Sequence, residues 1–317
     1  MAKLVTFQSG DHQGYGVLDH SASTICDFTQ VDLSRYGAPD SVRDMLSLIE
    51  LGHAGAAIAN RVRDDVDVWP AAACVDLAGA KLLPSLPRPL TVRDFVSFEK
   101  HLLQCARRHE GFEDWTPPQI WYDRPVYYRG NPLSFVGHEA PVPAPKATQK
   151  LDYELEMGFI IGKQGRDIPA DAGLDYVFGL TIFNDFTARD VQREDAAVYM
   201  GPCRSKDYDG CNAMGPWIAT LDEIPDVTDL TMTIRLNGKE IGRGKSGDAH
   251  HSIGDMIAIA SQETTLYPGE FMGTGTVGDG AGLEKGISIK SGDVVELEID
   301  QLGVLRNPVV THSASNA

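Results

Sequence analysis

Residues Leu151–Gln192 read LDYELEMGFIIGKQGRDIPADAGLDYVFGLTIFNDFTARDVQ, and their pattern guides the interpretation of the whole chain. Polar and apolar residues alternate at the start, which predicts a β-strand with Asp152, Glu154 and Glu156 on one face. Three like charges on a buried strand repel and cost desolvation energy, so a cation, most simply a hard divalent metal ion, should neutralise them. The alternative is an edge strand whose carboxylates face solvent, and a lone Glu-x-Glu pair favours that alternative.

A second apolar run, residues 176–183, predicts another strand, which leads into Asn184-Asp185. Oxygen-only ligation by Glu154, Glu156 and Asp185 would select Mg²⁺, Ca²⁺ or Mn²⁺ over zinc. Arg189 follows, and its guanidinium can hold an anionic substrate through two parallel hydrogen bonds. The alternative for Arg189 is an ordinary surface ion pair.

The composition argues against several classes of partner. The 317 residues carry 28 basic and 45 acidic side chains, a net charge of -17, which opposes binding to nucleic acid or an anionic membrane. An anionic substrate must therefore be attracted by local cations. No run approaches the roughly 20 apolar residues of a membrane span. Five cysteines without a C-x-x-C pair indicate a reducing, cytoplasmic location.

A proline-rich segment, residues 83–89, predicts a linker because proline at this density cannot lie inside a helix or a central strand. We expect a small N-terminal α+β domain, residues 1–85, and a catalytic domain, residues 86–317. The predicted fold class is α+β, predominantly β. Small polar residues at 312–317 predict a frayed tail.

Local patterns predict further elements. Short strands are expected within residues 3–27, and helices over 42–51, with Ser41 as N-cap, and over 54–63. Residues 230–236 alternate and lead into Asn237-Gly238, a hairpin signal. The remaining expected elements are a helix over 252–261 and a last clear strand over 294–299.

An ordered set of short motifs resembles the fumarylacetoacetate hydrolase family. The set comprises D-Y-E-x-E at 152–156, I-G-K at 161–163, N-D-x-T-A-R-D-x-Q at 184–192, Lys206, G-P-W at 215–217, L-N-G at 236–238, G-T-G-T at 273–276 and G-D-V at 292–294. Each motif is weak alone, but their order over about the second half of the chain is specific. The resemblance implies a mixed β-roll for the catalytic domain and a homodimer.

The resemblance also implies roles for individual residues. Glu154, Glu156 and Asp185 would ligate the metal ion. In fumarylacetoacetases a further aspartate ligand stands seven residues before the catalytic histidine, and here Asp94 stands seven residues before His101. This spacing sharpens the resemblance from the family to that subgroup.

His101 would then be the general base. Glu284, just beyond the G-T-G-T motif, would fix its tautomer and stabilise the imidazolium. A surface histidine and a solvated loop glutamate are the alternatives for these two residues.

The substrate side follows from the same resemblance. Arg189, Gln192 and Lys206 would stabilise negative charge on the leaving enolate, although Lys206 could instead be a surface-loop lysine. Thr276 and Tyr128 would contact substrate. The sequence departs from the pattern at Val96 and over 207–210, where fumarylacetoacetases have a substrate-contacting tyrosine and small or aromatic residues. The chemistry therefore transfers more firmly than the identity of the acyl group.

The resemblance implies a metal-dependent hydrolase of aromatic catabolism that cleaves a carbon-carbon bond in a small anionic β-diketo acid, fumarylacetoacetate or an acylpyruvate. His101 and Glu284 would activate water, and Mg²⁺ or Ca²⁺, with Mn²⁺ also acceptable, would stabilise the enolate. The same fold also supports 2-oxo acid decarboxylases, tautomerases and hydratases. The His101 and Glu284 pair favours hydrolysis, because the other reactions need no activated water at a carbonyl. A catalytically silent metal-binding scaffold is an alternative of another class.

Overall fold

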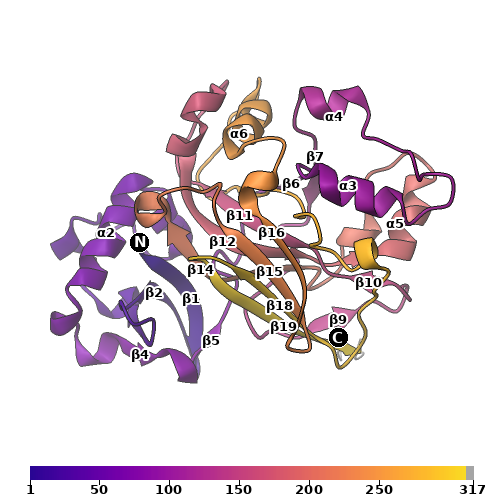
Figure 1. The fold of residues 1–317 in the computed structure, drawn as a ribbon. Helices are drawn as coiled ribbons and strands as arrows, with labels where there is room; N and C mark the ends of the chain where they lie inside the picture. Colours follow the sequence, from indigo (N-terminus) through magenta and orange to yellow (C-terminus); the bar gives the residue numbers. More distant parts are fainter. Residues whose placement is uncertain (312–317) are drawn as a thin grey trace.

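Two β-sheets form the body of the protein, as the ribbon in Figure 1 shows. This computed structural model describes residues 1–311, so the predicted frayed tail, residues 312–317, lies outside the described residues. Within residues 1–311 the larger sheet has twelve strands and the smaller sheet has five, while six short α-helices lie around them. The predicted α+β, predominantly β class is confirmed.

The bounds of the elements are as follows. The larger sheet contains β1 (Lys3–Ser9), β2 (His12–Leu18), β3 (Thr24–Asp27), β4 (Cys74–Asp76), β5 (Lys81–Leu82), β6 (Val92–Phe95), β7 (Tyr127–Gly130), β8 (Phe135–Val136), β11 (Leu155–Ile161), β12 (Val177–Asp185), β14 (Asn212–Thr220) and β17 (Phe271–Gly273). The smaller sheet contains β9 (Val142–Ala144), β15 (Thr231–Leu236), β16 (Lys239–Lys245), β18 (Val294–Ile299) and β19 (Gly303–Thr311). A two-stranded ladder joins β10 (Leu151–Asp152) to β13 (Thr187–Ala188). The α-helices are α1 (Met45–Ile49), α2 (His53–Asp64), α3 (Glu99–Ala106), α4 (Gln119–Asp123), α5 (Arg189–Ala196) and α6 (Ile253–Ser261).

Strand β11 lies inside the larger sheet, in the order β4-β3-β2-β1-β14-β12-β11-β17-β6-β7. It pairs antiparallel with β12 on one side and with β17 on the other. All seven of its residues are buried. The alternative of a solvent-facing edge strand is therefore wrong.

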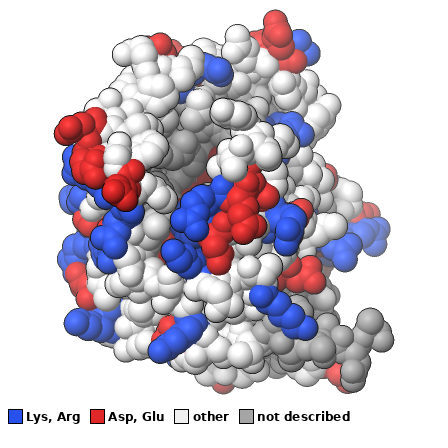
Figure 2. All heavy atoms as spheres, turned by 90° about the vertical axis from the view of Figure 1, so that its right-hand side faces the viewer, with Lys and Arg blue, Asp and Glu red and all other residues white. Residues whose placement is uncertain are grey.

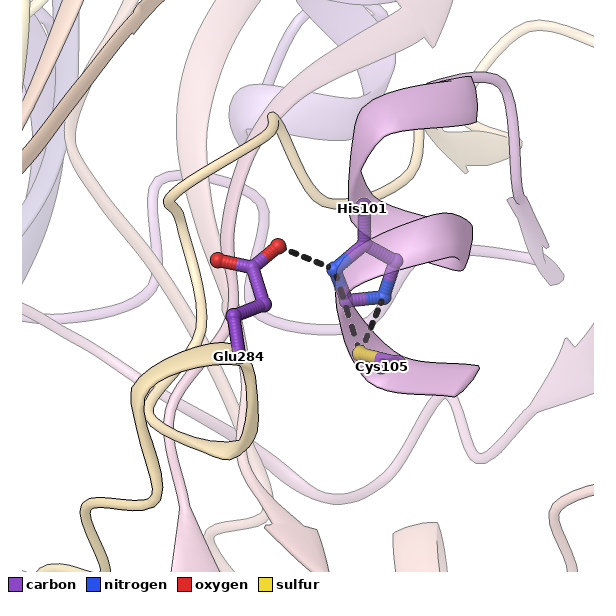
Figure 3. A group of neighbouring side chains, drawn as sticks. All are labelled: His101, Cys105 and Glu284. Carbon is purple, nitrogen blue, oxygen red and sulfur yellow. Dashed lines mark hydrogen bonds and ion pairs between the residues drawn. The ribbon is translucent and has the colours of Figure 1, made fainter. Parts of the chain in front are cut away.

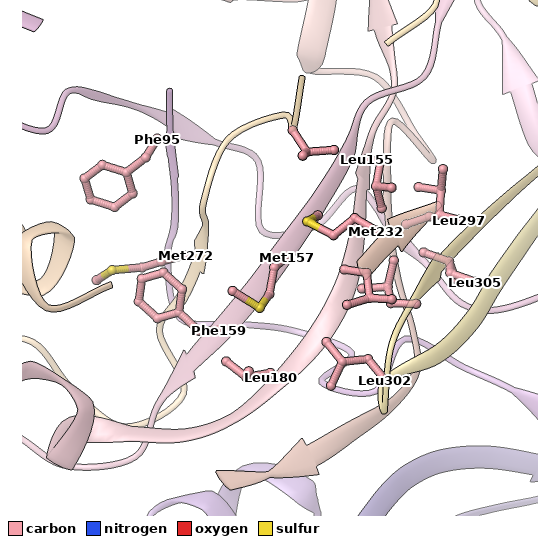
Figure 4. Packing of buried hydrophobic residues seen from close by; sticks show 14 of the residues in the cluster. Phe95, Leu155, Met157, Phe159, Leu180, Met232, Met272, Leu297, Leu302 and Leu305 are labelled. Atoms are coloured by element: carbon pink, nitrogen blue, oxygen red, sulfur yellow. The ribbon is translucent and has the colours of Figure 1, made fainter. Parts of the chain in front are cut away.

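The main hydrophobic core lies between the two sheets. Figure 4 shows Met157 and Phe159 of β11 and Leu180 of β12 near Met232, Leu297 and Leu305 of the smaller sheet. Burying each such side chain contributes about 1.5–3 kcal/mol. Alternation along β11 sends Met157 and Phe159 into this core, so Glu156 projects from the opposite face.

The N-terminal strands extend the same sheet, because β1 pairs antiparallel with β14 through Leu4 and Ile218. Helices α1 and α2 pack on this part of the sheet through a second apolar cluster that includes Leu48 and Ile58. The division near residue 85 stays a prediction. No helix among the described residues is long and apolar enough to cross a membrane.

Several local predictions are confirmed, and two need correction. The 237–238 hairpin joins β15 to β16, and Ser252 caps α6. Helix α1 begins at Met45, because Asp44 and Ser47 form a capping box, so the predicted Ser41 cap is wrong. Strand β19 follows the last predicted strand and was missed, since Asn307-Pro308 interrupts the expected strand pattern.

Candidate metal centre and catalytic cavity

The predicted site residues converge on a cavity of about 610 Å³ beside α3 and α5. Nine of them line it: Asp94, His101, Tyr128, Glu154, Glu156, Arg189, Gln192, Lys206 and Thr276. The two others, Asp185 and Glu284, are buried and hydrogen-bond to lining residues. Figure 2 shows this side of the molecule, where the surface is hollowed and basic and acidic side chains gather beside the hollow.

Three carboxylates form a compact buried cluster. Asp94 comes from β6, Glu156 from β11 and Asp185 from the end of β12, and one oxygen of each lies within 4.8 Å of the others. The three side chains are buried. Gly273 of β17 lies between them, and a Cβ there would be 2.4 Å from Asp94 Oδ1 and 2.7 Å from Glu156 Oε2. The absence of a side chain at Gly273 therefore allows two strands to bring their carboxylates together.

These residues fit a hard divalent cation. Among the described residues, neither Asp94 Oδ1 nor Asp185 Oδ1 has a hydrogen-bond partner, although both atoms are buried. Burial, together with Glu156 and Asp185, holds the pKa of Asp94 well above its usual range. Burial also raises the pKa of Glu156 to about 8, and the charges of Asp185 and Glu154 add to this effect. Carboxylate oxygens are the ligands that Mg²⁺, Ca²⁺ and Mn²⁺ prefer. Binding such a cation would also relieve the repulsion between these buried carboxylates.

Glu154, the fourth predicted ligand, lies beside this cluster and is paired with cations. Its carboxylate accepts hydrogen bonds from Arg189 Nη2 at 2.5 Å and from Lys206 Nζ. Burial alone would raise the pKa of Glu154, but Arg189, Lys206 and His101 hold it well below its usual range. The structure thus brings together Asp94, Glu156 and Asp185, and Lys206 joins Glu154 to Asp185 at the edge of this cluster. The predicted role of Glu154 as a metal ligand stays a prediction.

Lys206 bridges Glu154 and Asp185, because its Nζ donates to both carboxylates. Its side chain is buried at 5% exposure, so the alternative of a surface-loop lysine is wrong. Burial would lower its pKa, but Asp185 and Glu154 hold that pKa above its usual range. Lys206 is therefore a fixed positive charge at the edge of the acidic cluster.

His101 and Glu284 form a buried pair on the cavity wall. His101 Nδ1 lies 2.7 Å from Glu284 Oε1 (Figure 3). Ala281 N donates to Glu284 Oε2 at 3.0 Å. His101 Nε2 lies 3.6 Å from Glu154 Oε1. Since His101 and Glu284 are both buried, the surface alternatives for them are wrong. Burial would lower the pKa of His101, but Cys105 and Glu284 hold it well above its usual value.

Arg189 begins α5 and joins Asp152 and Glu154 to the cavity wall. Its Nε donates to Asp152 Oδ2 at 2.8 Å and its Nη1 donates to Gln192 Oε1 at 3.1 Å, besides the bond to Glu154. Three of its five N–H groups are thus engaged, and two remain for an anion. Asp152 also accepts bonds from Gly282 N and Leu283 N. The alternating pattern located Asp152, but only the structure reveals this linking role.

Tyr128 and Thr276 hold carboxylates of the acidic cluster. Tyr128 Oη donates to Asp185 Oδ2 at 2.8 Å, and Thr276 Oγ1 donates to Glu156 Oε1 at 3.3 Å. Both side chains also line the cavity, so they can contact a bound molecule there. Their predicted contact with substrate stays a prediction.

The mouth of the site is basic. A second cavity of about 390 Å³ shares Arg189 and Gln192 with the first and is also lined by Lys150 and Arg193. The side chains of Lys150 and Arg193 are exposed, and within residues 1–311 neither forms an ion pair. Their sequence neighbourhood gave no sign of this role, because the cavity assembles from distant segments. They are candidates for the local cations that an anionic ligand of an acidic protein requires.

Comparisons with known proteins agree with this geometry. Residues 91–310 match the family described as fumarylacetoacetate (FAA) hydrolase C-terminal. An uncharacterised protein of Staphylococcus epidermidis is 37% identical over 174 residues, 54% of this chain and 56% of that protein. The match thus spans little more than half the length of this curated relative.

Solved structures share the whole fold. Fumarylacetoacetate hydrolase from Exiguobacterium antarcticum has 26% sequence identity and a TM-score of 0.74, with 98% of this chain and 100% of that chain covered. Maleylpyruvate hydrolase from Sphingobium sp. SYK-6, in complex with manganese(II) and pyruvate, has 24% identity and a TM-score of 0.73, with 99% and 100% covered. At this lower identity the likeness shows the fold alone.

Proposed function

The chain belongs to the fumarylacetoacetate hydrolase family, and we propose that it is a metal-dependent hydrolase that cleaves a carbon-carbon bond in a β-diketo acid of the acylpyruvate class. One observation carries this proposal. The buried acidic cluster and the His101–Glu284 pair face the same cavity. A cation site and an activated water are the two parts that this hydrolysis requires.

Asp94, Glu156 and Asp185, with Glu154 beside them as the fourth predicted ligand, would hold Mg²⁺ or Ca²⁺, with Mn²⁺ also acceptable. When bound, the cation neutralises these carboxylates and stabilises negative charge on substrate oxygens. The complex of the related-fold maleylpyruvate hydrolase with manganese(II) and pyruvate supports this choice of ligand chemistry.

His101 acts as the base. Glu284 accepts the hydrogen bond from Nδ1–H. The positive charge of a cation held by the neighbouring carboxylates would oppose the raised pKa of His101 and favour the neutral imidazole, whose Nε2 can take a proton from water. The water oxygen then bonds to the acyl carbonyl carbon, and the bond from that carbon to the central methylene breaks. The electron pair leaves as the enolate of pyruvate, which takes up a proton. The products are a carboxylic acid and pyruvate, and one water is consumed.

Cationic side chains neutralise the substrate and the leaving group. Lys206 is fixed by Glu154 and Asp185 and stands where negative charge develops. Arg189 has two N–H groups left for the substrate carboxylate, and Lys150 and Arg193 attract anions to the mouth. This local positive charge offsets the overall charge of -17. The proposal includes a homodimer in the cytoplasm that acts in aromatic catabolism, as the family resemblance implies.

The test is to follow loss of diketone absorbance for acylpyruvates, and for fumarylacetoacetate as a β-diketo acid that would release acetoacetate instead of pyruvate, with Mg²⁺ and after chelation. Metal-dependent cleavage into two acids supports the proposal. His101→Ala should abolish turnover and leave cation affinity nearly intact, because His101 is outside the acidic cluster. Wild-type activity in His101→Ala would refute the base assignment, and loss of carbon dioxide alone would identify a decarboxylase.

A further inference from the structure

Helix α3 carries the proposed base but has little apolar attachment of its own. Of its eight residues, all within the described chain, His101 alone is buried. Burial of apolar side chains is what usually fixes a helix on a protein. Polar contacts must therefore contribute to the position of α3.

One residue collects several of these polar contacts. Lys100 Nζ lies 2.5 Å from Asp279 Oδ2, and Gln104 Nε2 donates to Asp279 Oδ1 at 2.8 Å. Gln104 Oε1 in turn accepts a bond from Asp279 N at 3.1 Å, so the two residues bond reciprocally. Lys100 precedes His101 by one residue and Gln104 follows it by one helical turn, and Asp279 therefore holds α3 on both sides of the base.

The same carboxylate also holds the segment that carries Glu284. Lys285 Nζ donates to Asp279 Oδ1 at 2.9 Å, and Lys285 directly follows Glu284. Burial would raise the pKa of Asp279, but its bonds with Lys100, Lys285 and Gln104 hold that pKa well below its usual range. The carboxylate is thus ionised throughout the range in which the protein would work.

The segment around Asp279 is anchored to Leu155, the first residue of β11. Leu155 N donates to Gly280 O at 3.1 Å, and Val277 N donates to Leu155 O at 3.1 Å. Asp279 itself has a φ of +66°, a left-handed conformation that aspartate tolerates better than most residues. This backbone aims its carboxylate at α3 from a segment that the larger sheet holds in place.

We propose that Asp279 is a positioning residue that fastens α3, and with it His101, to the turn that carries Glu284. It touches neither the acidic cluster nor the His101 ring, so it acts on the reaction only through their geometry. This inference rests on the proposed hydrolysis for its catalytic consequence. The structural consequence, a fixed α3, holds whatever the reaction is.

The test compares Asp279→Asn and Gln104→Leu with wild type. Both remove contacts between α3 and Asp279, and we call them the clamp variants. Gln104→Leu changes no charge, which separates positioning from electrostatics. Glu298→Gln is the matched control, because Glu298 is also partly exposed and pairs with Arg235 at 2.5 Å in the smaller sheet. We expect kcat to fall roughly tenfold to a hundredfold in both clamp variants, as for misplaced catalytic groups, with KM and Mg²⁺ affinity within about twofold of wild type.

A second readout needs no turnover. Cys105 lies on α3 with Sγ 3.7 Å from His101 Nδ1 and is partly buried, so its alkylation reports the position of the helix (Figure 3). Iodoacetamide labelling of Cys105, followed by mass spectrometry on metal-free protein, should be roughly tenfold faster in both clamp variants and unchanged in Glu298→Gln.

Wild-type kcat and wild-type labelling in both clamp variants would overturn the proposal. A parallel loss of Mg²⁺ affinity would overturn it as well, because it would indicate general damage to the site. If wild-type protein cleaves no acylpyruvate, the proposed function fails, and the labelling rates still decide whether Asp279 fixes α3.

Discussion

Replacing Glu284 by glutamine tests the pairing on which the proposed base depends. The carboxylate accepts two buried hydrogen bonds, from His101 Nδ1 at 2.7 Å and from Ala281 N at 3.0 Å. A carboxamide has the same shape but only one oxygen, so one of the two donors must lose its partner. An unpaired buried donor costs about 1–3 kcal/mol of the free energy of unfolding.

The catalytic effect follows from the charge on the imidazole. His101 becomes an imidazolium when it takes the proton from water, and a hydrogen bond to such a charged group is worth about 1.5–3 kcal/mol. Losing it in the transition state should lower kcat roughly 10- to 160-fold. Mg²⁺ affinity should not change, because Glu284 is not part of the acidic cluster.

The assay is the initial rate of diketone loss at saturating Mg²⁺, with calorimetry for cation affinity. Glu99→Gln is the control. Glu99 lies on α3, the helix that carries His101, and its carboxylate accepts a hydrogen bond from Tyr122 instead of from His101. Its kcat should stay within about twofold of wild type, as is usual for partly exposed positions away from the chemistry. A Glu284→Gln variant with wild-type kcat would refute the reasoning.

Four further predictions concern the cation and the mouth of the cavity. Glu156→Ala should lose both Mg²⁺ binding and turnover because it removes a buried ligand, and unchanged affinity by calorimetry would contradict the cluster assignment. Cation affinity should rise with pH up to about 8, because the cation must displace the proton that burial and neighbouring charges hold on Glu156, and a flat profile would argue against this. The raised pKa of Glu156 also contributes to the stability of the metal-free fold at low pH, and this contribution is lost as pH rises from about 4.5 to about 8. In thermal unfolding, the melting temperature should therefore fall over this pH range without Mg²⁺ and should not fall with Mg²⁺ bound. Replacing Lys150 and Arg193 together by glutamine should raise KM roughly tenfold and weaken its salt dependence, with kcat nearly unchanged, and an unaltered KM would exclude the proposed anion attraction.

Alternation in the sequence was a sound guide to β11, but the single strand expected from Asp152 onward is wrong, because Asp152 ends β10 and β11 begins at Leu155. It correctly separated Met157, which enters the core, from Glu156, which enters the cavity. The spacing from Asp94 to His101 also led to one cavity, because β6 and α3 are consecutive in the chain and only a short segment separates them. Local periodicity and close spacing carry such information.

Pairings between distant segments could not be read from the sequence. Whether Glu154 joins the acidic cluster or pairs with cations depends on Arg189 and Lys206, which are 35 and 52 residues away. The contact of Asp279 with Gln104 spans 175 residues and leaves no local pattern. These contacts exist only because the strands of the larger sheet bring the segments together.

The central claim is that this cavity adds water across a carbon-carbon bond, and hydrolysis in ¹⁸O-labelled water tests it most directly. Mass spectrometry of the products from an acylpyruvate and Mg²⁺ should find one solvent oxygen in the newly formed carboxylate and a full equivalent of pyruvate. An isomerised substrate, or carbon dioxide without a new carboxylic acid, would contradict the account.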